Sequence, residues 1–492
     1  MKRIVNNRPI VFSAISLVAG MTSRACFNAS SLFYVVLSLF LVGFILCFFV
    51  KPIKQYKFEI LIIALFFVFG NLYTLYNVNL YESDGCFSGK SDLISGTVCK
   101  IYASSDKSQT VTLTDLTIGD IKTYGNALVR FSDQSLVCGQ SVSFNGNVTF
   151  IPFSLESYSS KTSFRITPET IISVNSPSSV FYIVSNHVKN VIATNVSGDE
   201  AGVMIALVLG DTSKIASDTL DNFRLSGISH IFAVSGLHVV FFSSLISEVL
   251  GFCKIKGVKN TVISALFCVF YAGLCGFPVS CVRAVIMSVT LNFVKNAGRK
   301  YDALNSLFLS LIIVVAIFPN TLFSYGLILS YLAVLSIAVC SKIFEEFFGF
   351  LPETIRQSLS VSFAVSYIMT PVLFKMFGYA SVITVFLNVF IVPVVSILYT
   401  LTFFSTLIVS VVPFFAIVFK LPYYVVYFIN SVLEELNVVS FSVNSTVSVL
   451  SLILYYLFAF VFIDRTNFKK PVKLISGLLS VATLILAVFG VL

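Results

Sequence analysis

Side chains that could do chemistry gather in one segment of the chain, residues 207–239. It begins Leu-Val-Leu-Gly-Asp-Thr-Ser and ends Phe-Arg-Leu-Ser-Gly-Ile-Ser-His-Ile-Phe-Ala-Val-Ser-Gly-Leu-His-Val. Two of the three histidines, His230 and His238, lie within it. In an apolar chain such polar groups must face protein or water, and glycines let backbones approach closely. The segment is therefore the first candidate site.

One interpretation of this segment is an intramembrane serine hydrolase, since Ala-Val-Ser235-Gly resembles a nucleophile motif. A serine nucleophile needs a base on an adjacent element, itself oriented by a third group. His238 lies three residues along the same predicted helix, so the two side chains share a direction but rarely meet. No recognised ligand spacing joins Asp211, His230 and His238 as a metal site. The alternative, a polar helix-packing motif, stays open.

A second candidate is Arg283, which lies inside an apolar run. A central arginine in a membrane helix costs about 2.5–3.5 kcal/mol on insertion scales, so it usually faces a water-filled cavity or an acidic partner. Gly276 and Pro278 just upstream suggest a broken or re-entrant helix, which is tolerated where backbone lines a cavity. A guanidinium inside a pore suits a phosphate chain. Snorkelling of Arg283 toward the interface is the alternative.

A third feature is Asn388 with Pro393, within an otherwise apolar run. Pro393 predicts a helix kink. Asn388 either cross-links two helices or lines a path.

Composition identifies the setting of these residues. Of the 492 residues, 57% are hydrophobic and 11% are charged, and the mean hydropathy is +0.94. No soluble domain needs so much apolar surface. The net charge of +9 lies mainly in short loops, which is the distribution of the positive-inside rule and says little about DNA. The basic N-terminus followed by an apolar run reads as a first transmembrane helix rather than a cleaved leader.

The apolar runs predict about 11–13 transmembrane helices. Three open the chain, at residues 9–27, 31–50 and 59–77, with the N-terminus in the cytoplasm. The others have approximate cores at 231–252, 260–276, 279–294, 303–318, 322–341, 358–376, 381–411, 412–433, 446–463 and 473–492. Alternation from an outside start brings the basic loops 254–259, 295–300 and 465–473 to the cytoplasm, as the positive-inside rule requires.

Between the third run and residue 176 the pattern changes to alternating, β-branched segments with polar turns. Five strands are predicted: Asp92–Tyr102, Gln109–Ile118, Ile121–Phe131, Gln140–Phe150 and Lys161–Val174. Five antiparallel strands suit a small closed barrel of the OB type, which often binds single strands, although a β-sandwich stays open. Lys/Arg and Asp/Glu cancel in this stretch, so DNA binding here is only a hypothesis. If it lies outside the cytoplasm, a disulfide becomes possible among Cys86, Cys99 and Cys138, and Cys99–Cys138 is the preferred pair.

The predicted layout has four parts. Residues 1–80 form an N-terminal three-helix membrane region, and residues 81–176 form the extracytoplasmic OB-like barrel. Residues 177–229 are helical but too polar to span, so they are expected as interfacial amphipathic helices. Residues 230–492 form a channel-like membrane domain. The ten cysteines include no CxxC pair or zinc spacing, and no metal, cofactor or enzymatic activity is expected.

Two stretches resemble the ComEC family of competence proteins. The first is Leu207-Val-Leu-Gly-Asp, continued by Phe223, Ser226-Gly-Ile-Ser-His230 and Ala233-Val-Ser-Gly-Leu-His238. The second is Tyr271-Ala-Gly with Val279-Ser-Cys-Val-Arg-Ala-Val-Ile-Met287. An external barrel after three helices also matches the family layout. The resemblance implies a bacterial inner-membrane channel that passes single-stranded DNA inward during natural transformation, with a duplex-DNA receptor outside and an ATP-driven motor inside.

The chain departs from many ComEC relatives at its C-terminus. Those relatives carry a metallo-β-lactamase-like domain with an H-x-H-x-D-H site, whereas this chain ends in an apolar helix and has only His187, His230 and His238. We therefore expect no such nuclease site here, and degradation of the second strand would need a separate nuclease.

The resemblance assigns roles to the candidate residues. Those expected to line or shape the DNA path are Asp211, Arg224, His230, Ser235, His238, Arg283 and Asn388. Those expected to shape helix packing are Gly210, Gly227, Gly236, Gly276, Pro278 and Pro393. The main rival is a secondary transporter of a small solute or lipid. An inverted repeat would favour that rival, and none is seen; the intramembrane hydrolase is the second rival.

Overall fold

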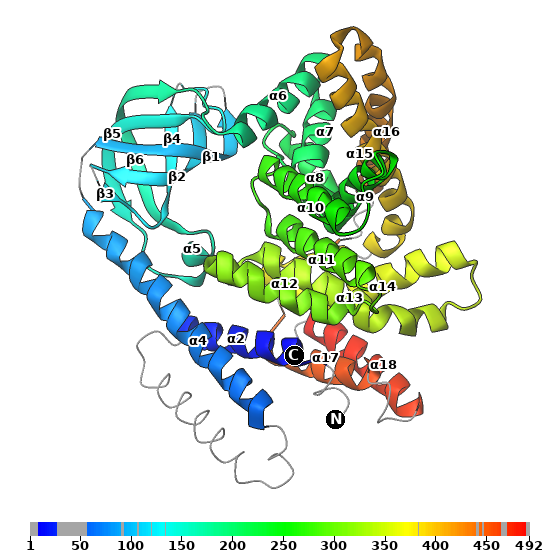
Figure 1. Ribbon diagram of the computed structural model, residues 1–492. Helices are drawn as coiled ribbons and strands as arrows, with labels where there is room; N and C mark the ends of the chain where they lie inside the picture. Colours follow the sequence, from blue (N-terminus) through cyan, green and yellow to red (C-terminus); the bar gives the residue numbers. More distant parts are fainter. Residues whose placement is uncertain are drawn as a thin grey trace. The chain divides into compact units, whose positions relative to one another are not determined.

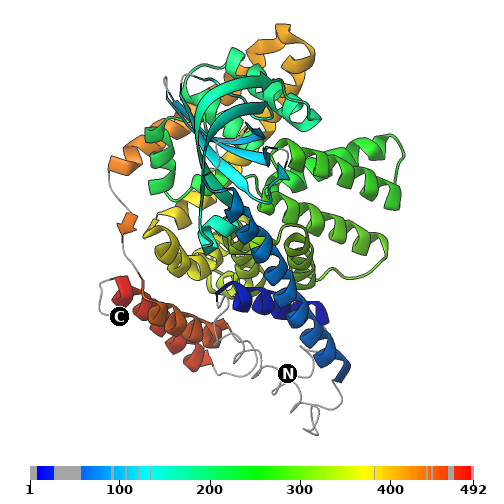
Figure 2. The same cartoon turned by 90° about the vertical axis from the view of Figure 1, so that its left-hand side faces the viewer.

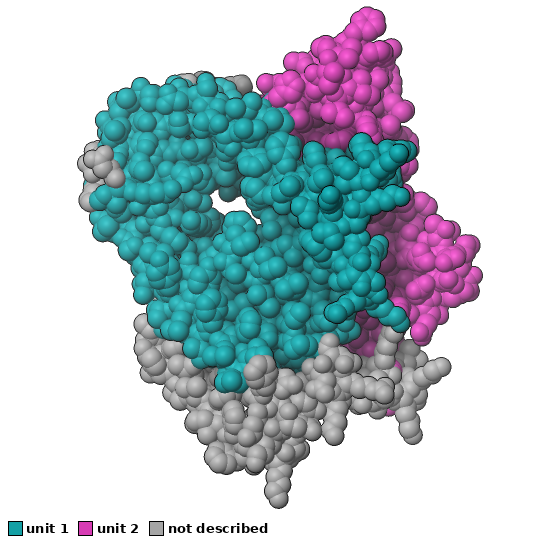
Figure 3. All heavy atoms as spheres, viewed as in Figure 1, with its two compact units in different colours: residues 1–186, 239–328 teal, residues 187–238, 329–492 magenta. Residues whose placement is uncertain are grey.

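The computed structural model describes residues 8–26, 57–89, 93–105, 108–119, 121–132, 134–381, 383–438, 442–444, 447–463 and 470–488. These residues form mostly helices together with one β-barrel (Figure 1). The chain divides into two compact units, coloured separately in Figure 3. Unit 1 comprises residues 1–186 and 239–328, and unit 2 comprises residues 187–238 and 329–492. Both units therefore draw on distant parts of the sequence.

Unit 1 begins with α2 (Pro9–Cys26) and α4 (Lys57–Ser83), which cross in close contact (Figure 2). A Cβ atom on Gly20 would lie 2.2 Å from the Phe67 carbonyl oxygen, and one on Gly70 would lie 2.5 Å from the Leu17 carbonyl oxygen. Only glycine permits this approach of backbones, as at small-residue interfaces between membrane helices. The helix predicted at 31–50 lies outside the described residues.

The other helices of unit 1 are α10 (Gly257–Leu274), α11 (Val279–Asn296), α12 (Ala303–Ile317) and the short η4 (Pro319–Phe323), together with most of α9 (Gly236–Phe252). Hydrogen bonds between polar side chains join them. The Ser288 hydroxyl of α11 donates to that of Ser243 in α9, with 3.3 Å between the oxygens. Such bonds add to the packing of helices that have little hydrophobic drive to associate in lipid.

The barrel consists of β1 (Leu93–Ser105), β2 (Ser108–Ile118), β3 (Ile121–Lys122), β4 (Asn126–Ser132), β5 (Ser141–Phe150) and β6 (Thr162–Asn175). Its strand order is β1-β5-β6-β4-β2-β3, and β1 also pairs with β2, which closes the barrel. The pair β4–β6 is parallel and the others are antiparallel. Inward side chains such as Val129 and Phe144 are fully buried. An OB-like barrel inserted in a mostly helical chain is thus confirmed.

One predicted strand, Ile121–Phe131, is divided in the structure into β3 and β4. The buried carboxylate of Asp84 accepts the backbone N–H groups of Tyr124 (3.0 Å) and Gly125 (2.8 Å). The carboxylate thus pairs two backbone N–H groups in a tight bend, where no neighbouring strand supplies an acceptor. A contact from 40 residues upstream therefore interrupts a strand whose local sequence favours continuity.

Polar contacts fix the barrel to the helices of unit 1. The hydroxyl of Tyr81 in α4 donates to the carbonyls of Ile151 (3.1 Å) and Thr162 (2.8 Å). The buried amide of Asn320 in η4 donates to the Tyr158 carbonyl (3.1 Å) and accepts from the Tyr124 hydroxyl (3.1 Å). Tyr158 belongs to α5 (Leu155–Ser159), a short helix begun by a serine capping box and not predicted from the sequence.

The predicted Cys99–Cys138 disulfide is absent: both residues are thiols, so this prediction was wrong for the structure. Tyr182 of α6 (Val180–Asn195) lies beside both. Its side chain fills the space in front of Gly139, where an added Cβ atom would lie 2.4 Å from the Cβ atom of Tyr182. Burial raises the pKa of Tyr182. The Asn186 amide donates to the Cys138 carbonyl (2.8 Å). Helix α6 thus packs where a disulfide was expected.

Unit 2 contains α7 (Asp199–Leu209), α8 (Ser217–Leu225), η3 (Ser229–Phe232), most of α13 (Tyr325–Phe347), α14 (Glu353–Phe377), β7 (Tyr379–Ser381), α15 (Thr384–Val411), η5 (Pro413–Phe419), α16 (Lys420–Val438), β8 (Ser442–Asn444), α17 (Val449–Ile463) and α18 (Lys470–Val488). Its main core joins α7, η3, α15 and α16 through buried residues such as Met204, Phe232 and Leu398. Strands β7 and β8 pair antiparallel.

Seven described helices are long and apolar enough to cross a membrane, and four shorter apolar helices accompany them. The long ones are Pro9–Cys26, Leu61–Phe87, Gly257–Leu274, Tyr325–Phe347, Glu353–Phe377, Thr384–Val411 and Pro413–Glu435. The chain is a multi-pass membrane protein, as its composition predicted.

Candidate functional site

The candidate segment begins with α7, which is buried on every side. All nine residues from Ala201 to Leu209 are buried, because this stretch is uniformly apolar and has no polar face to expose. The interfacial amphipathic helices predicted at 177–229 therefore do not include α7. Helix α8 fits that description better, since Phe223 is its one buried residue.

The loop after α7 is held against that helix from both ends. The Asp199 carboxylate, at the start of α7, accepts the Ala216 N–H (3.1 Å) and the Thr219 hydroxyl (2.6 Å). A Cβ atom on Gly202 would lie 2.5 Å from the Lys214 carbonyl oxygen. The loop 210–216 thus lies directly on the α7 backbone.

Asp211 in this loop forms an ion pair with Lys189 of α6, with 2.6 Å between Oδ2 and Nζ. The two side chains are only 24% and 20% exposed. Burial raises the pKa of Asp211, but the Lys189 ammonium and the Ser213 N–H, which donates to Oδ1 at 3.0 Å, lower it more, so the pKa lies below its ordinary value. The carboxylate predicted to face a DNA path is therefore engaged within the protein.

Two glycines of the segment occupy left-handed backbone positions in close contact with other elements. Gly210 (φ +74°) packs against Val234, whose Cγ2 would lie 2.9 Å from an added Cβ. Gly227 (φ +74°) packs against Thr384 at the start of α15, whose hydroxyl would lie 1.8 Å from an added Cβ. That hydroxyl donates to the Ser226 carbonyl (3.0 Å). Gly236 is the first residue of α9.

Ser235 and His238 are in contact, contrary to the expectation that they rarely meet. The Ser235 N–H donates to His238 Nδ1 (3.1 Å), Ser235 Oγ lies 3.2 Å from the same nitrogen, and the Leu237 N–H donates to Ser235 Oγ (3.3 Å). The bond from the Ser235 N–H to the side chain of His238, the third residue of α9, is one half of a capping box. The Ser235 hydroxyl accepts the N–H of Leu237, the second residue, which is an ordinary N-cap bond. The pair thus begins helix α9.

The other face of His238 is packed in the interior of unit 2. The ring is 3% exposed and meets Tyr399 of α15 edge-on, with 4.4 Å between ring centroids. Because Nδ1 accepts a hydrogen bond from a backbone N–H, Nε2 carries the ring proton, and it has no hydrogen-bond partner among the described residues. A hydrolase would need an acid at that nitrogen, so the geometry disfavours the hydrolase.

His230 and Arg224 are exposed at the surface of unit 2. His230 Nδ1 lies 3.3 Å from the Gly227 carbonyl oxygen. Arg224 pairs with Asp221 one turn earlier, at 2.9 Å. These two side chains are the accessible members of the candidate set in this unit.

Asn388 lies where α14 and α15 pack together. Its amide nitrogen is 3.5 Å from the Ser362 hydroxyl, which itself donates to the Val385 carbonyl (2.8 Å). The amide oxygen is buried and has no hydrogen-bond partner among the described residues. Pro393 lies inside α15, which continues past it to Val411. Of the two roles considered, the structure favours Asn388 as a cross-link.

Arg283 belongs to unit 1 and lies a little over one turn into α11. It is 7% exposed, and its Nη1 lies 3.6 Å from Met287 Sδ. The preceding residues form a tight turn between two complete helices, rather than the broken or re-entrant helix that was predicted. Gly276 (φ +78°) and Phe277 (φ +53°) turn the backbone there, and Pro278 is the N-cap of α11. Phe277 is an unusual left-handed residue without a glycine's freedom.

The described residues contain no group of three or more His, Cys, Asp or Glu side chains that could hold a metal ion. In unit 2 the structure brings Ser235 and His238 together and links the Gly227 turn to α15. It does not bring Asp211 to the histidines. Sequence reasoning missed the partners Lys189, Thr384 and Tyr399; only Lys189 gave a signal, as a cation on the polar face of α6.

Comparison with known proteins gives a family match over the same segment. The model of the Competence protein family matches residues 207–469. ComE operon protein 3 of Bacillus subtilis is 27% identical over 195 residues, which are 40% of this chain and 25% of that protein. Recombination protein 2 of Haemophilus influenzae is 26% identical over 133 residues, 25% of this chain and 16% of that protein. The chain thus spans a quarter or less of these relatives. No solved structure is significantly similar to it.

Proposed function

The chain belongs to the Competence protein family, and from that membership we propose that it forms a membrane channel that passes single-stranded DNA into the cell during natural transformation. The observation that carries this proposal is the family match over residues 207–469, which begins at the Leu207-Val-Leu-Gly-Asp motif. Seven helices able to cross a membrane are in keeping with it.

A channel fits the site better than the two rivals. A hydrolase lacks an acid at His238 Nε2 in the described residues, and the Ser235–His238 contact already serves as a helix cap. A secondary transporter would be favoured by an inverted repeat, which the sequence does not show. The function proposed is therefore conduction rather than catalysis.

In this proposal Arg283 is the residue that meets the phosphate chain. Arg283 is buried in a bundle of apolar helices, and a guanidinium can bind two oxygens of a phosphodiester at once. His230 and Arg224, both exposed in unit 2, shape the path further, together with Asp211, Ser235, His238 and Asn388 as supports of the surrounding backbone.

The test is uptake of labelled DNA in a naturally transformable host. Deletion of the gene should abolish entry of labelled strand into a nuclease-resistant state. Arg283→Met keeps the volume of the side chain and removes its charge, so uptake should fall at least about tenfold, the effect of losing one charge-assisted contact of about 1.5–3 kcal/mol. Arg283→Lys, the matched control, should keep part of it. Normal uptake in the Met variant, at equal amounts in the membrane, would remove Arg283 from the proposal.

The barrel offers a second surface for the strand. The ammonium of Lys100 lies 4.6 Å from the ring centroid of Tyr102, and Tyr102 is 53% exposed. Arg130 of β4 is also exposed. It lies on a neighbouring part of the sheet, since it pairs with Thr110 of β2, which in turn pairs with Ala103 of β1. Aromatic stacking next to cations is how OB barrels bind single strands. We include this face in the proposed path.

Tyr102→Ala should weaken binding of an oligothymidylate to the purified full chain by about tenfold, for the loss of one stacking contact. Lys100→Ala should also weaken it, because it removes a cation that attracts the phosphates. Lys122→Ala is the control, since Lys122 is an exposed cation already paired with Asp115 at 2.7 Å. Equal losses in all three variants would show that general charge, and not this face, holds the strand.

The remaining elements of the proposal concern orientation and partners. The chain lies in the bacterial inner membrane with its N-terminus in the cytoplasm and its barrel outside. The four-part layout at 1–80, 81–176, 177–229 and 230–492 describes the order of these regions. A duplex-DNA receptor outside delivers the strand, an ATP-driven motor inside pulls it, and a separate nuclease degrades its complement.

A further inference from the structure

Six cations lie at one end of the helices of unit 1. They come from the α9–α10 loop and the first turn of α10, and from the last turn of α11 and the α11–α12 loop. All are exposed: Lys254, Lys256, Lys259, Lys295, Arg299 and Lys300. Among the described residues, none of the six takes part in an ion pair. We call this group the basic end.

Hydrogen bonds show that the two loops are neighbours. Asn260, in the first turn of α10, donates to the Ser247 carbonyl (3.0 Å) and accepts from the Ser247 hydroxyl (2.8 Å), near the end of α9. The next residue, Thr261, accepts from the Asn296 amide (2.9 Å) at the end of α11. Adjacent residues of α10 thus hold the ends of α9 and α11, so the cations of both loops share one surface.

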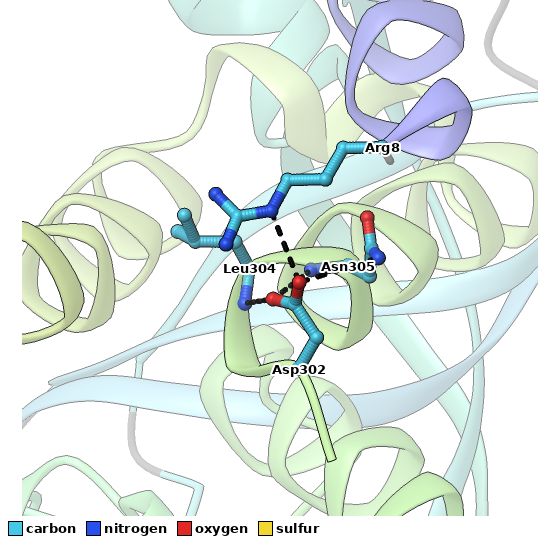
Figure 4. Close-up of polar contacts among 4 residues, drawn as sticks. All are labelled: Arg8, Asp302, Leu304 and Asn305. Carbon is cyan, nitrogen blue, oxygen red and sulfur yellow. Dashed lines mark hydrogen bonds and ion pairs between the residues drawn. The ribbon is translucent and has the colours of Figure 1, made fainter. Parts of the chain in front are cut away.

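The acid in these loops does not neutralise the basic end. Asp302 accepts the backbone N–H groups of Leu304 (3.0 Å) and Asn305 (3.3 Å) as the N-cap of α12, and it pairs with Arg8 at 3.0 Å (Figure 4). Its charge is thus balanced by a seventh cation. Glu248, one turn before the end of α9, is the nearest other acid in the adjoining described sequence.

The turns at the opposite end of these helices contain no charged residue, and the buried Arg283 lies a little over one turn into α11. The turn 275–278 between α10 and α11 reads Cys-Gly-Phe-Pro, and residues 317–324 after α12 read Ile-Phe-Pro-Asn-Thr-Leu-Phe-Ser. The charge of these helices is therefore concentrated at one of their two ends.

An exposed apolar stripe leads along α10 to the basic end. Its members recur at helical spacing and are 53%, 44%, 65% and 45% exposed, in the order Val258, Val262, Leu266 and Val269. Phe252, in the loop region beside Lys254, is 89% exposed. In a membrane protein such a stripe faces acyl chains, and cations at its end are level with lipid headgroups.

We propose that the basic end binds anionic phospholipid, with the headgroup phosphates on the six cations and an acyl chain along the α10 stripe. Clusters of four to eight Lys/Arg next to a membrane helix attract anionic lipid in this way. A DNA strand fits less well, because a polyanion on the cations would leave uncovered the exposed apolar stripe, which extends three turns away from them. The proposal concerns the folded protein, beyond the role of basic loops in setting orientation.

The test uses the purified full chain in nanodiscs that mix phosphatidylglycerol with phosphatidylcholine, and it measures by native mass spectrometry which lipid stays bound. The wild type should retain phosphatidylglycerol several-fold over its bulk share. Lys295→Gln/Arg299→Gln/Lys300→Gln should lose at least half of that enrichment. A matched variant with three other cations changed on the barrel, Lys122→Gln/Lys161→Gln/Arg165→Gln, should keep it.

Two further arms keep the test decisive. Leu266→Ser and Phe252→Ser retain every charge and should still lower the enrichment, because they remove apolar contact with the acyl chain. No enrichment in the wild type, equal enrichment in the loop and barrel variants, or displacement of the lipid by an oligonucleotide would each overturn the proposal.

Discussion

Lys189 and Asp211 lie 22 residues apart in the chain and meet at 2.6 Å, joining α6 to the loop that follows the buried helix α7. The contact fixes the Gly-Asp part of the family motif to an element outside it. Because the pair is mostly shielded from water, removal of one partner leaves the other charge without compensation and destabilises the folded protein.

Asp211→Asn should therefore destabilise unit 2 by about 2 kcal/mol, the usual value for a hydrogen bond to a charged group. The amide keeps the shape of the side chain but leaves the Lys189 ammonium without its counter-charge. The measurement is the thermal midpoint of the purified chain in detergent. Asp218→Asn, an exposed acid in the neighbouring α8, is the control and should leave the midpoint unchanged.

The same pair predicts a pH dependence. The pKa of Asp211 is lowered in the folded protein, so its stabilising contribution is present above the ordinary value of 3.8 and is lost as the pH falls through the folded pKa. The gap in thermal midpoint between wild type and Asp211→Asn should be full at neutral pH and close below pH 3.8. A gap that persisted in acid would mean that shape, and not charge, explains the effect.

Gly227→Ala tests the contact between the motif and α15. A Cβ at this position would lie 1.8 Å from the Thr384 hydroxyl, and φ is +74°, so both a clash and backbone strain arise. Gly276→Ala is a close control, because φ is +78° there and nothing lies within 4 Å of the added atom. The control should cost about 1–2 kcal/mol, the cost of a left-handed alanine.

The loss for Gly227→Ala should exceed that of the control and should be accompanied by reduced DNA uptake. Adding Thr384→Ala should recover part of the stability, since it removes the clashing atom while giving up one hydrogen bond of about 1 kcal/mol. Equal stabilities of the two alanine variants would show that the start of α15 shifts to make room for the added methyl group.

The barrel was predictable because its signals are local. Alternation and turn residues placed the strand Gln109–Ile118 within one residue of β2, and the predicted β5 and β6 segments begin one residue before the observed strands. The division of the third segment was not predictable, since the Asp84 carboxylate that bends it comes from the first residue of η2 (Asp84–Phe87), directly after α4. Local pattern fixes a strand's existence, and distant contacts fix its ends.

The candidate site was less predictable for the same reason. The motif glycines could be recognised by type, but Thr384, which requires Gly227 to lack a side chain, is more than 150 residues away. The Ser235–His238 contact was expected to be rare on a continuous helix, whereas the helix begins at Gly236 and leaves Ser235 free to turn back. The α10–α11 turn likewise depends on two left-handed residues whose φ angles no spacing rule supplies.

Asp84→Asn should loosen the barrel at its β3–β4 bend. The carboxylate offers an acceptor to each of two backbone N–H groups, whereas an amide has one acceptor and brings a donor against a donor. We expect a loss of about 2 kcal/mol and faster hydrogen exchange in β4. Asp115→Asn is the control, because the exposed Asp115–Lys122 pair is worth at most about 1 kcal/mol. Unchanged exchange in β4 would show that the bend holds without Asp84.

Ser235 and His238 distinguish a helix cap from a catalytic pair. Ser235→Ala removes the acceptor for the Leu237 N–H and the hydroxyl beside His238 Nδ1, but keeps the backbone bond to that nitrogen. It should cost about 1 kcal/mol, with uptake nearly intact. His238→Ala should lower stability more, because it leaves the Ser235 N–H without its acceptor and creates a cavity beside the Tyr399 ring. His238→Gln should recover much of that loss, since glutamine accepts from the cap residue in a capping box. A catalytic pair would behave differently: Ser235→Ala and His238→Gln would both abolish function, and a serine-reactive probe would label Ser235 in the wild type.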